Sequence, residues 1–300
     1  MNGTYRRPAL CLILLLPLAG CVTAGKEKPK LTSEPSIERA LDVLAGAAAS
    51  EPLTGFLYRN PVRFEYSSTA GACHKFSLKN GLIFLPREFK DSDNLLALSL
   101  ARAAYIYRLY VMTGMEEILA EEEETAALFQ ARIGLAIKLK NSDFERAKAA
   151  EELRSDFCTY IMEGSPAAVL SARTAALSTR PECQRPLETL QSQRIWLDET
   201  RAAINDESFF QLMKDRDLVK VRKGALTMNA AMKNDADLRA LPTDAIYRYQ
   251  RSFYDRQNGM FSLVSKLYRK ALEDDAAWRA ANQELIEQAR REFSACNLPE

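Results

Sequence analysis

The chain has 300 residues, of which 47% are hydrophobic, so it is long enough to bury one large core or two smaller ones. Its 41 basic and 40 acidic residues nearly cancel, and the formal net charge is +1. This balance lacks the basic excess that nucleic-acid-binding proteins use to attract phosphates. Nucleic acid is therefore not an expected partner.

The first 20 residues have the features of a targeting signal. Arg6 and Arg7 precede a mostly apolar run over residues 9–18. This run is shorter than the roughly 20 apolar residues that span a bilayer, so it predicts a cleaved signal peptide over residues 1–20. Residues 21–33 have no apolar period and are expected to form a tether.

The signal ends in Leu18-Ala19-Gly20-Cys21. This ending resembles the lipobox of bacterial lipoproteins, in which the signal is cut before the cysteine and the thiol carries a diacylglycerol. The resemblance implies acylation at Cys21, attachment to a membrane through the N-terminal lipid, and residence in the bacterial cell envelope. Val22 follows where an aspartate could stand, which by analogy with enteric bacteria favours the periplasmic face of the outer membrane. The alternative is an ordinary secretory signal with an incidental cysteine.

A small antiparallel sheet is expected within about residues 62–85. Alternation of apolar and polar residues predicts a strand from Val62 to Tyr66 and a second strand that begins near Phe76. Asn80-Gly81 then favours a type I′ turn, in which both central residues have positive φ, into a short third strand.

The chain beyond this sheet is predicted to be helical. A helix over about residues 94–112 is apolar on every side, which indicates that it is buried. Later helices are expected to break near Asn258-Gly259 and Asp274-Asp275, where turn and capping residues occur. The predicted fold class is α+β and predominantly α-helical, with an α+β domain over residues 34–180 and a helical region over residues 181–300.

Four cysteines remain after the signal and the predicted acylation site: Cys73, Cys158, Cys183 and Cys296. An even number in an oxidising compartment is typical of disulfides, and four cysteines allow three pairings. We favour Cys158–Cys183, because the two flank one predicted helical hairpin, which leaves Cys73–Cys296. Free buried thiols are the alternative.

No complete catalytic motif is present. The chain lacks the phosphate-binding loop, the dinucleotide-binding glycine pattern and the nucleophile elbow of hydrolases. Its single histidine, His74, excludes paired-histidine metal sites, and the neighbouring Cys73 would point to the opposite face of a strand. We therefore predict no catalytic residue, no bound metal and no cofactor.

The predicted third strand and the helix after it resemble the core of gluzincin-type zinc metallopeptidases. In that family the helix carries His-Glu-x-x-His, and a later helix supplies a third ligand in a Glu-x-x-Ala-Asp pattern. On this sequence, the two histidines fall on Ala101 and Tyr105, and the catalytic glutamate falls on Arg102. The later pattern keeps Glu123 and loses the aspartate, which is Ala127. The resemblance thus implies a pseudopeptidase that has lost its zinc site; an unrelated strand–helix core is the alternative.

Arg102 lies on a helical stripe whose other members are apolar or aromatic, so it is expected to be buried and to need a carboxylate partner. The resemblance to the peptidase core implies that Glu123 is this partner and that the guanidinium has replaced the metal. The alternative is that Arg102 extends its head into water. The rest of the acidic run, residues 121–124, is expected to be a solvated helix face.

The sequence leads to three functional hypotheses. The first is a membrane-anchored, catalytically inactive peptidase-like scaffold that binds a protein or another envelope component. The second is a hydrolase that acts on peptides or peptidoglycan through other residues. The third is a purely structural envelope lipoprotein.

Replacing Cys21 with serine tests the anchor. Cys21→Ser is expected to abolish labelling by radioactive palmitate, because serine lacks the thiol that would carry the diacylglycerol. Without its acyl chains the protein should move to the soluble fraction. Labelling and fractionation of the two proteins from the same cells make the comparison. A variant that is still labelled and membrane-bound would contradict the lipoprotein prediction.

Overall fold

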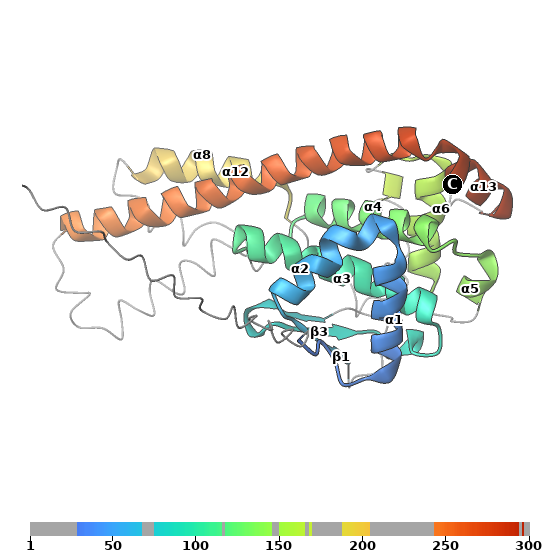
Figure 1. Cartoon of the computed structure of the whole chain (residues 1–300). Helices are drawn as coiled ribbons and strands as arrows, with labels where there is room; N and C mark the ends of the chain where they lie inside the picture. The colour runs from blue at the N-terminus through green and yellow to red at the C-terminus, as the bar shows by residue number, and fades with distance from the viewer. Residues whose placement is uncertain are drawn as a thin grey trace, which may run out of the picture.

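The computed structural model describes residues 29–67, 75–115, 118–145, 150–165, 168–169, 188–204, 243–293 and 296. Within these ranges the protein is α+β and predominantly helical, with one small sheet (Figure 1). The predicted fold class is confirmed. The predictions for Cys21, Cys73, His74 and Cys183 concern residues outside the described ranges.

The described elements follow one another along the chain without a repeat. The helices are α1 (Pro35–Gly46), α2 (Glu51–Arg59), α3 (Asp93–Thr113), α4 (Ala120–Ala136), α5 (Asn141–Glu145), α6 (Glu151–Met162), α8 (Leu190–Ile204), α12 (Thr243–Ala281) and α13 (Gln283–Glu292). The strands are β1 (Arg63–Tyr66), β2 (Lys75–Ser77) and β3 (Leu82–Leu85), with 3₁₀ turns at Ala48–Ser50, Leu78–Asn80 and Arg87–Phe89.

The sheet is mixed, so the prediction of an antiparallel sheet is wrong. Its strand order is β1-β3-β2, and β3 pairs in parallel with β1 and antiparallel with β2. The backbone N–H of Phe64 donates to the carbonyl of Leu31 at 2.8 Å, so the segment before α1 covers the outer edge of β1. Alternating apolar residues identify a strand and its buried face, but they carry no information on its direction.

The connection between β2 and β3 is not a type I′ turn. Gly81 has the expected positive φ of 58°, but Asn80 ends a 3₁₀ turn and is not in the left-handed region. The N–H of Gly81 donates to the carbonyl of Leu78 at 3.0 Å and closes that turn. Asn80-Gly81 therefore marked the correct place for a reversal, and only its glycine adopts the left-handed conformation.

α3 is the central helix of the body, as expected from its apolar surface. Its N-cap is Ser92, whose hydroxyl accepts from the N–H of Leu95, and its C-cap is Gly114, which has φ 71°. In the described part of the chain, α3 is the helix long and apolar enough to cross a membrane, but 72% of its most apolar window is buried within the protein. α1, α2 and α4 pack around it, together with β3 (Figure 1). It is therefore the core helix of a folded body.

α12 runs without interruption through both predicted breaks, which are therefore wrong. Gly259 within a helix costs about 1 kcal/mol relative to alanine, which packing along a long helix can offset. Asp275 is buried and binds Tyr160 rather than capping a new helix. With 39 residues, α12 is roughly 58 Å long, and it extends past the compact body with α8 beside it (Figure 1).

The disulfide joins Cys158 to Cys296, so the favoured Cys158–Cys183 pairing is wrong. Proximity in sequence suggested that pairing, whereas packing between α6 and the end of α13 decides the observed one. The rings of Phe157 and Phe293 are 5.0 Å apart between centroids, which brings the Cα atoms of the two cysteines to 5.8 Å. That separation lies within the range that a disulfide spans.

Removing this disulfide tests its contribution to stability. Cys158→Ala combined with Cys296→Ala is expected to lower the free energy of unfolding by about 2–5 kcal/mol, because the cross-link closes a long loop in the unfolded chain. Denaturant unfolding of the oxidised protein and of the variant measures the loss. Peptide mapping without reduction should recover the two cysteines linked, and a map that joins either one to Cys73 or Cys183 would contradict the assignment.

Candidate functional site

The N-terminal part of α4 carries four consecutive glutamates: Glu121, Glu122, Glu123 and Glu124. We call them the glutamate run. The prediction of a solvated face for the rest of this run is wrong for Glu122 and Glu124, whose exposed fractions are 6% and 7%. Glu123, expected to be the partner of Arg102, is 2% exposed. Successive helical residues point about 100° apart, so the four side chains face four different neighbours.

Three members of the glutamate run accept hydrogen bonds, one from the N-terminal cap of α4 and two from other helices. Glu122 accepts from the backbone N–H of Leu119 at 2.9 Å and so caps its own helix. Glu121 accepts from the N–H of Leu190 at 2.9 Å, at the start of α8. Glu124 accepts from the hydroxyl of Tyr268 on α12 at 2.6 Å.

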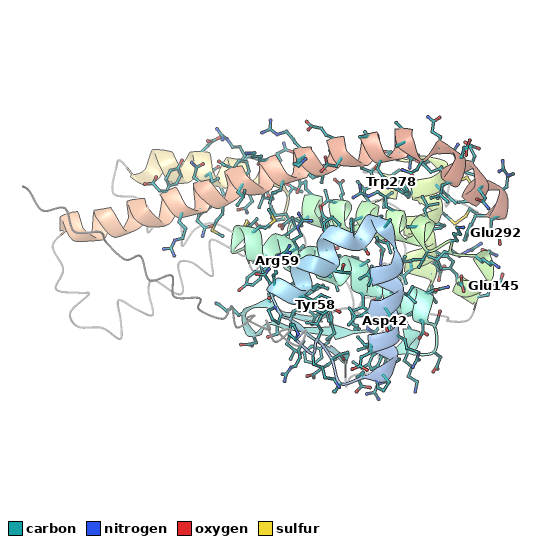
Figure 2. The ribbon with its side chains drawn as sticks, in the orientation of Figure 1. Asp42, Tyr58, Arg59, Glu145, Trp278 and Glu292 are labelled. Carbon is teal, nitrogen blue, oxygen red and sulfur yellow. A yellow bond between two sulfur atoms is a disulfide. The ribbon has the colours of Figure 1, made fainter. Side chains whose placement is uncertain are left out.

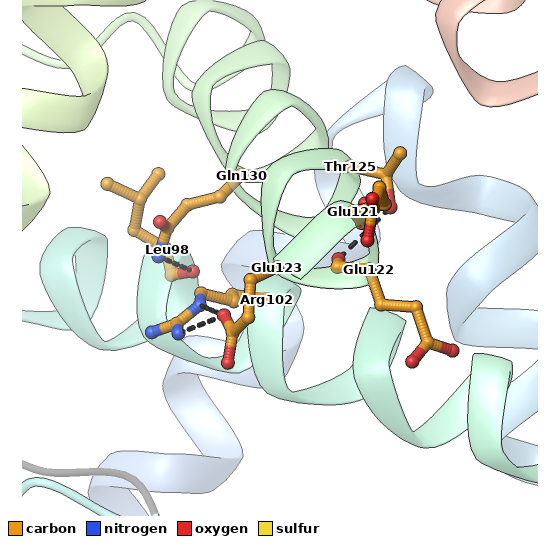
Figure 3. A network of polar contacts seen from close by, with 7 residues as sticks. All are labelled: Leu98, Arg102, Glu121, Glu122, Glu123, Thr125 and Gln130. Carbon is orange, nitrogen blue, oxygen red and sulfur yellow. Dashed lines mark hydrogen bonds and ion pairs between the residues drawn. The ribbon is translucent and has the colours of Figure 1, made fainter. Parts of the chain in front are cut away.

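The fourth member, Glu123, binds Arg102 on α3, as the sequence predicts (Figure 3). The guanidinium donates from Nε at 3.2 Å and from Nη2, both to Oε2 of the carboxylate. The two side chains are only 6% and 3% exposed, so Arg102 does not extend its head into water. Two turns along α4, Gln130 donates to the carbonyl of Leu98 at 2.9 Å and adds a second polar contact between the same helices.

The other two positions of the resembled motif do not join this pair in a reactive arrangement. Ala101 is fully buried and has no side-chain donor or acceptor. Tyr105 stacks on Phe129, with ring centroids 5.1 Å apart. Burial raises the pKa of the Tyr105 phenol, and a hydrogen bond with Thr125 lowers it in part. The phenol is therefore protonated at neutral pH.

These residues do not fit a zinc ion. Zinc in a catalytic site needs three nitrogen, oxygen or sulfur ligands and a water. Ala101 provides none, the Arg102 cation repels a metal, and Glu123 is already bound to that cation. In the described ranges, no group of three or more histidine, cysteine, aspartate or glutamate side chains is arranged to hold a metal.

A second buried polar cluster, which the sequence did not reveal, joins α12 to the body. The hydroxyl of Tyr160 on α6 donates to Asp275 at 2.9 Å, and Arg132 on α4 lies 3.5 Å from the same oxygen. Arg279 donates to the carbonyl of Tyr160 at 2.7 Å and lies over its ring. The sequence Asp274-Asp275 indicated a turn. It did not indicate the buried bond with Tyr160, because a partner more than a hundred residues away leaves no local signal.

Burial has the largest effect on the pKa values of Asp275, Glu124 and the two tyrosines that bind them. It raises the pKa of Asp275, against the lowering effects of Arg132 and of the Tyr160 hydroxyl. It also raises the pKa of the Tyr160 and Tyr268 phenols, and the neighbouring carboxylates raise both further. Glu124 likewise has a raised pKa, first because of burial. The phenols thus act as hydrogen-bond donors, and the arrangement stabilises helix packing.

A double-mutant cycle measures the buried pair. Arg102→Met and Glu123→Gln are each expected to cost about 3–5 kcal/mol of unfolding free energy, because each leaves a buried charge without its partner. The double variant should cost less than the sum. The matched control is the exposed pair Arg39–Asp93, for which Arg39→Met and Asp93→Asn should be nearly additive. Additive losses at Arg102 and Glu123 would contradict the assigned interaction.

Comparison of the chain with protein-family models, with curated proteins and with solved structures found no match. The resemblances to bacterial lipoproteins and to gluzincin-type peptidases remain predictions from the residue pattern.

Proposed function

We propose that this protein is a membrane-anchored envelope lipoprotein that binds a protein or another envelope component and does not catalyse a reaction. Its Cys21 would carry the lipid that holds it to the membrane. The folded body would then present its surface to partners in the envelope.

The closed Arg102–Glu123 pair is the observation that carries this proposal. In a peptidase of the resembled type, the equivalent positions surround a zinc-bound water that the substrate must reach. Here a guanidinium and a carboxylate bind each other there, with 6% and 3% of their side chains exposed. A buried ion pair offers neither a nucleophile nor access, so the pair supports a scaffold rather than an enzyme.

The exposed apolar side chains provide places at which to test binding. In the described part of the chain, Val111, Met112 and Ile195 are large apolar residues with 40%, 41% and 48% of their surface exposed. Val111 and Met112 lie at the end of α3, and Ile195 lies on α8. Because α8 accompanies α12 beyond the compact body (Figure 1), Ile195 is the best placed of the three to meet a partner.

Crosslinking in intact cells tests this proposal. The tagged protein is expected to form a discrete crosslinked complex, and Ile195→Glu should reduce its yield about tenfold, because a charge replaces an apolar contact in an interface. The matched control is Gln191→Glu, which adds the same charge one turn away at an exposed position and should leave the yield unchanged.

Three results would contradict the proposal. The first is hydrolysis of peptides or peptidoglycan by the purified protein. The second is about one tightly bound zinc per chain by elemental analysis. The third is the absence of any specific crosslinked complex, which would favour a purely structural lipoprotein.

A further inference from the structure

A pocket of about 400 Å³ lies between the C-terminal end of α4, α6 and α13. Figure 2 labels Glu292, one of its lining residues, at the end of the molecule where α13 lies close to α5. Leu135, Leu139 and Phe157 form an apolar floor, and Leu285 of α13 lines the pocket as well. Both its volume and its apolar lining are typical of small-molecule sites.

The lining also includes three cations: Lys138, Lys140 and Arg291. All three are exposed, and the described residues place no carboxylate in an ion pair with any of them. Glu292 is the single acidic lining residue, so the pocket has an excess of positive charge. An apolar floor below cationic side chains suits a ligand with an apolar body and an anionic group.

Lys138, at the edge of the pocket, has a backbone conformation that is unusual for lysine. It has φ 55°, and within the described ranges it is the only residue other than glycine with positive φ. This conformation is disfavoured for a side chain with a Cβ, and glycine or asparagine usually occupies it at the end of a helix. The lysine at this position gives the pocket a positive charge that glycine would lack.

The walls of the pocket are held in place without a ligand. The Cys158–Cys296 disulfide ties the chain after α13 to α6, and Arg290 of α13 donates to the carbonyl of Ile161 at 2.6 Å. A Cβ at Gly134 would lie 2.8 Å from the ring of Phe157, so the absence of a side chain there lets this ring pack directly on α4. A preformed pocket binds its ligand with little ordering cost.

We propose that this pocket binds a single acyl chain with an anionic head group, such as a free fatty acid or a lysophospholipid with net negative charge. The methylenes lie on the floor formed by Leu135, Leu139 and Phe157, and the carboxylate or phosphate binds Lys138, Lys140 and Arg291. This inference goes beyond the proposed function and does not depend on the anchor at Cys21.

Titration calorimetry on the oxidised mature chain, residues 21–300 with Cys21→Ser, tests the proposal. Palmitate and lysophosphatidylglycerol are added below their critical micelle concentrations, with zwitterionic lysophosphatidylcholine as the lipid control. One or both anionic lipids should bind with unit stoichiometry, at least about tenfold tighter than the control. Binding of palmitate alone would identify a carboxylate ligand, and binding of lysophosphatidylglycerol would identify a phosphate ligand. Shorter acyl chains should weaken binding by up to about fourfold per methylene removed from the floor.

Charge variants separate this pocket from general attraction to the protein surface. Lys138→Gln, Lys140→Gln and Arg291→Gln together should weaken binding by at least about tenfold, since an exposed ion pair contributes up to roughly fivefold in affinity. The matched control replaces three exposed cations outside the pocket, Lys30, Lys266 and Arg269, with glutamine and should have no effect.

A third variant fills the pocket with a larger side chain. Ala289→Trp on α13 should abolish binding while the disulfide and the unfolding transition are retained. If it fails to fold, the charge variants still decide, because their side chains are exposed. The proposal is overturned if neither anionic lipid binds, if the zwitterionic lipid binds as tightly as the anionic ones, or if the pocket and control variants behave alike.

Discussion

The glutamate run near the start of α4 connects this helix to α3, α8 and α12. Helical geometry points these adjacent side chains in different directions, toward α3, the start of α4, the start of α8 and the middle of α12. The N-terminal end of a helix also favours negative charge, because its N–H groups are not used within the helix. One short segment thus meets the local requirement of its helix and the tertiary requirement of three others.

The same contacts occupy the carboxylates of this region with partners from the protein itself. Each carboxylate of the run has a partner, and burial of three of them means that the loss of a partner leaves a charge in a poorly solvated interior. The buried phenol of Tyr160 donates to Asp275, the half-buried phenol of Tyr268 donates to Glu124 of the run, and both phenols stay protonated. In the described part of the chain, these buried polar groups therefore connect helices to one another.

The two ends of α4 differ in a way that follows from the helix dipole. Its first turn is acidic and enclosed, whereas Lys138 follows its last turn at the edge of an open pocket with an apolar floor. The disulfide and the aromatic rings of Phe144, Phe157 and Phe293 stabilise this second end. The acidic end forms hydrogen bonds with α8 and α12, and the other end borders the pocket.

The sequence by itself determined the fold class, the extent of the buried helix α3, the reversal at Gly81 and the Arg102–Glu123 pair. The first three depend on local periodicity or on a conformation that glycine tolerates. The buried Arg102 required some carboxylate partner, and the resemblance to a peptidase core singled out Glu123. The tertiary structure alone decided the direction of β1, the Cys158–Cys296 disulfide, the continuity of α12 through Asp275 and the burial of Glu124 against Tyr268. These features depend on which distant segments pack together, and neither periodicity nor spacing along the chain encodes that choice.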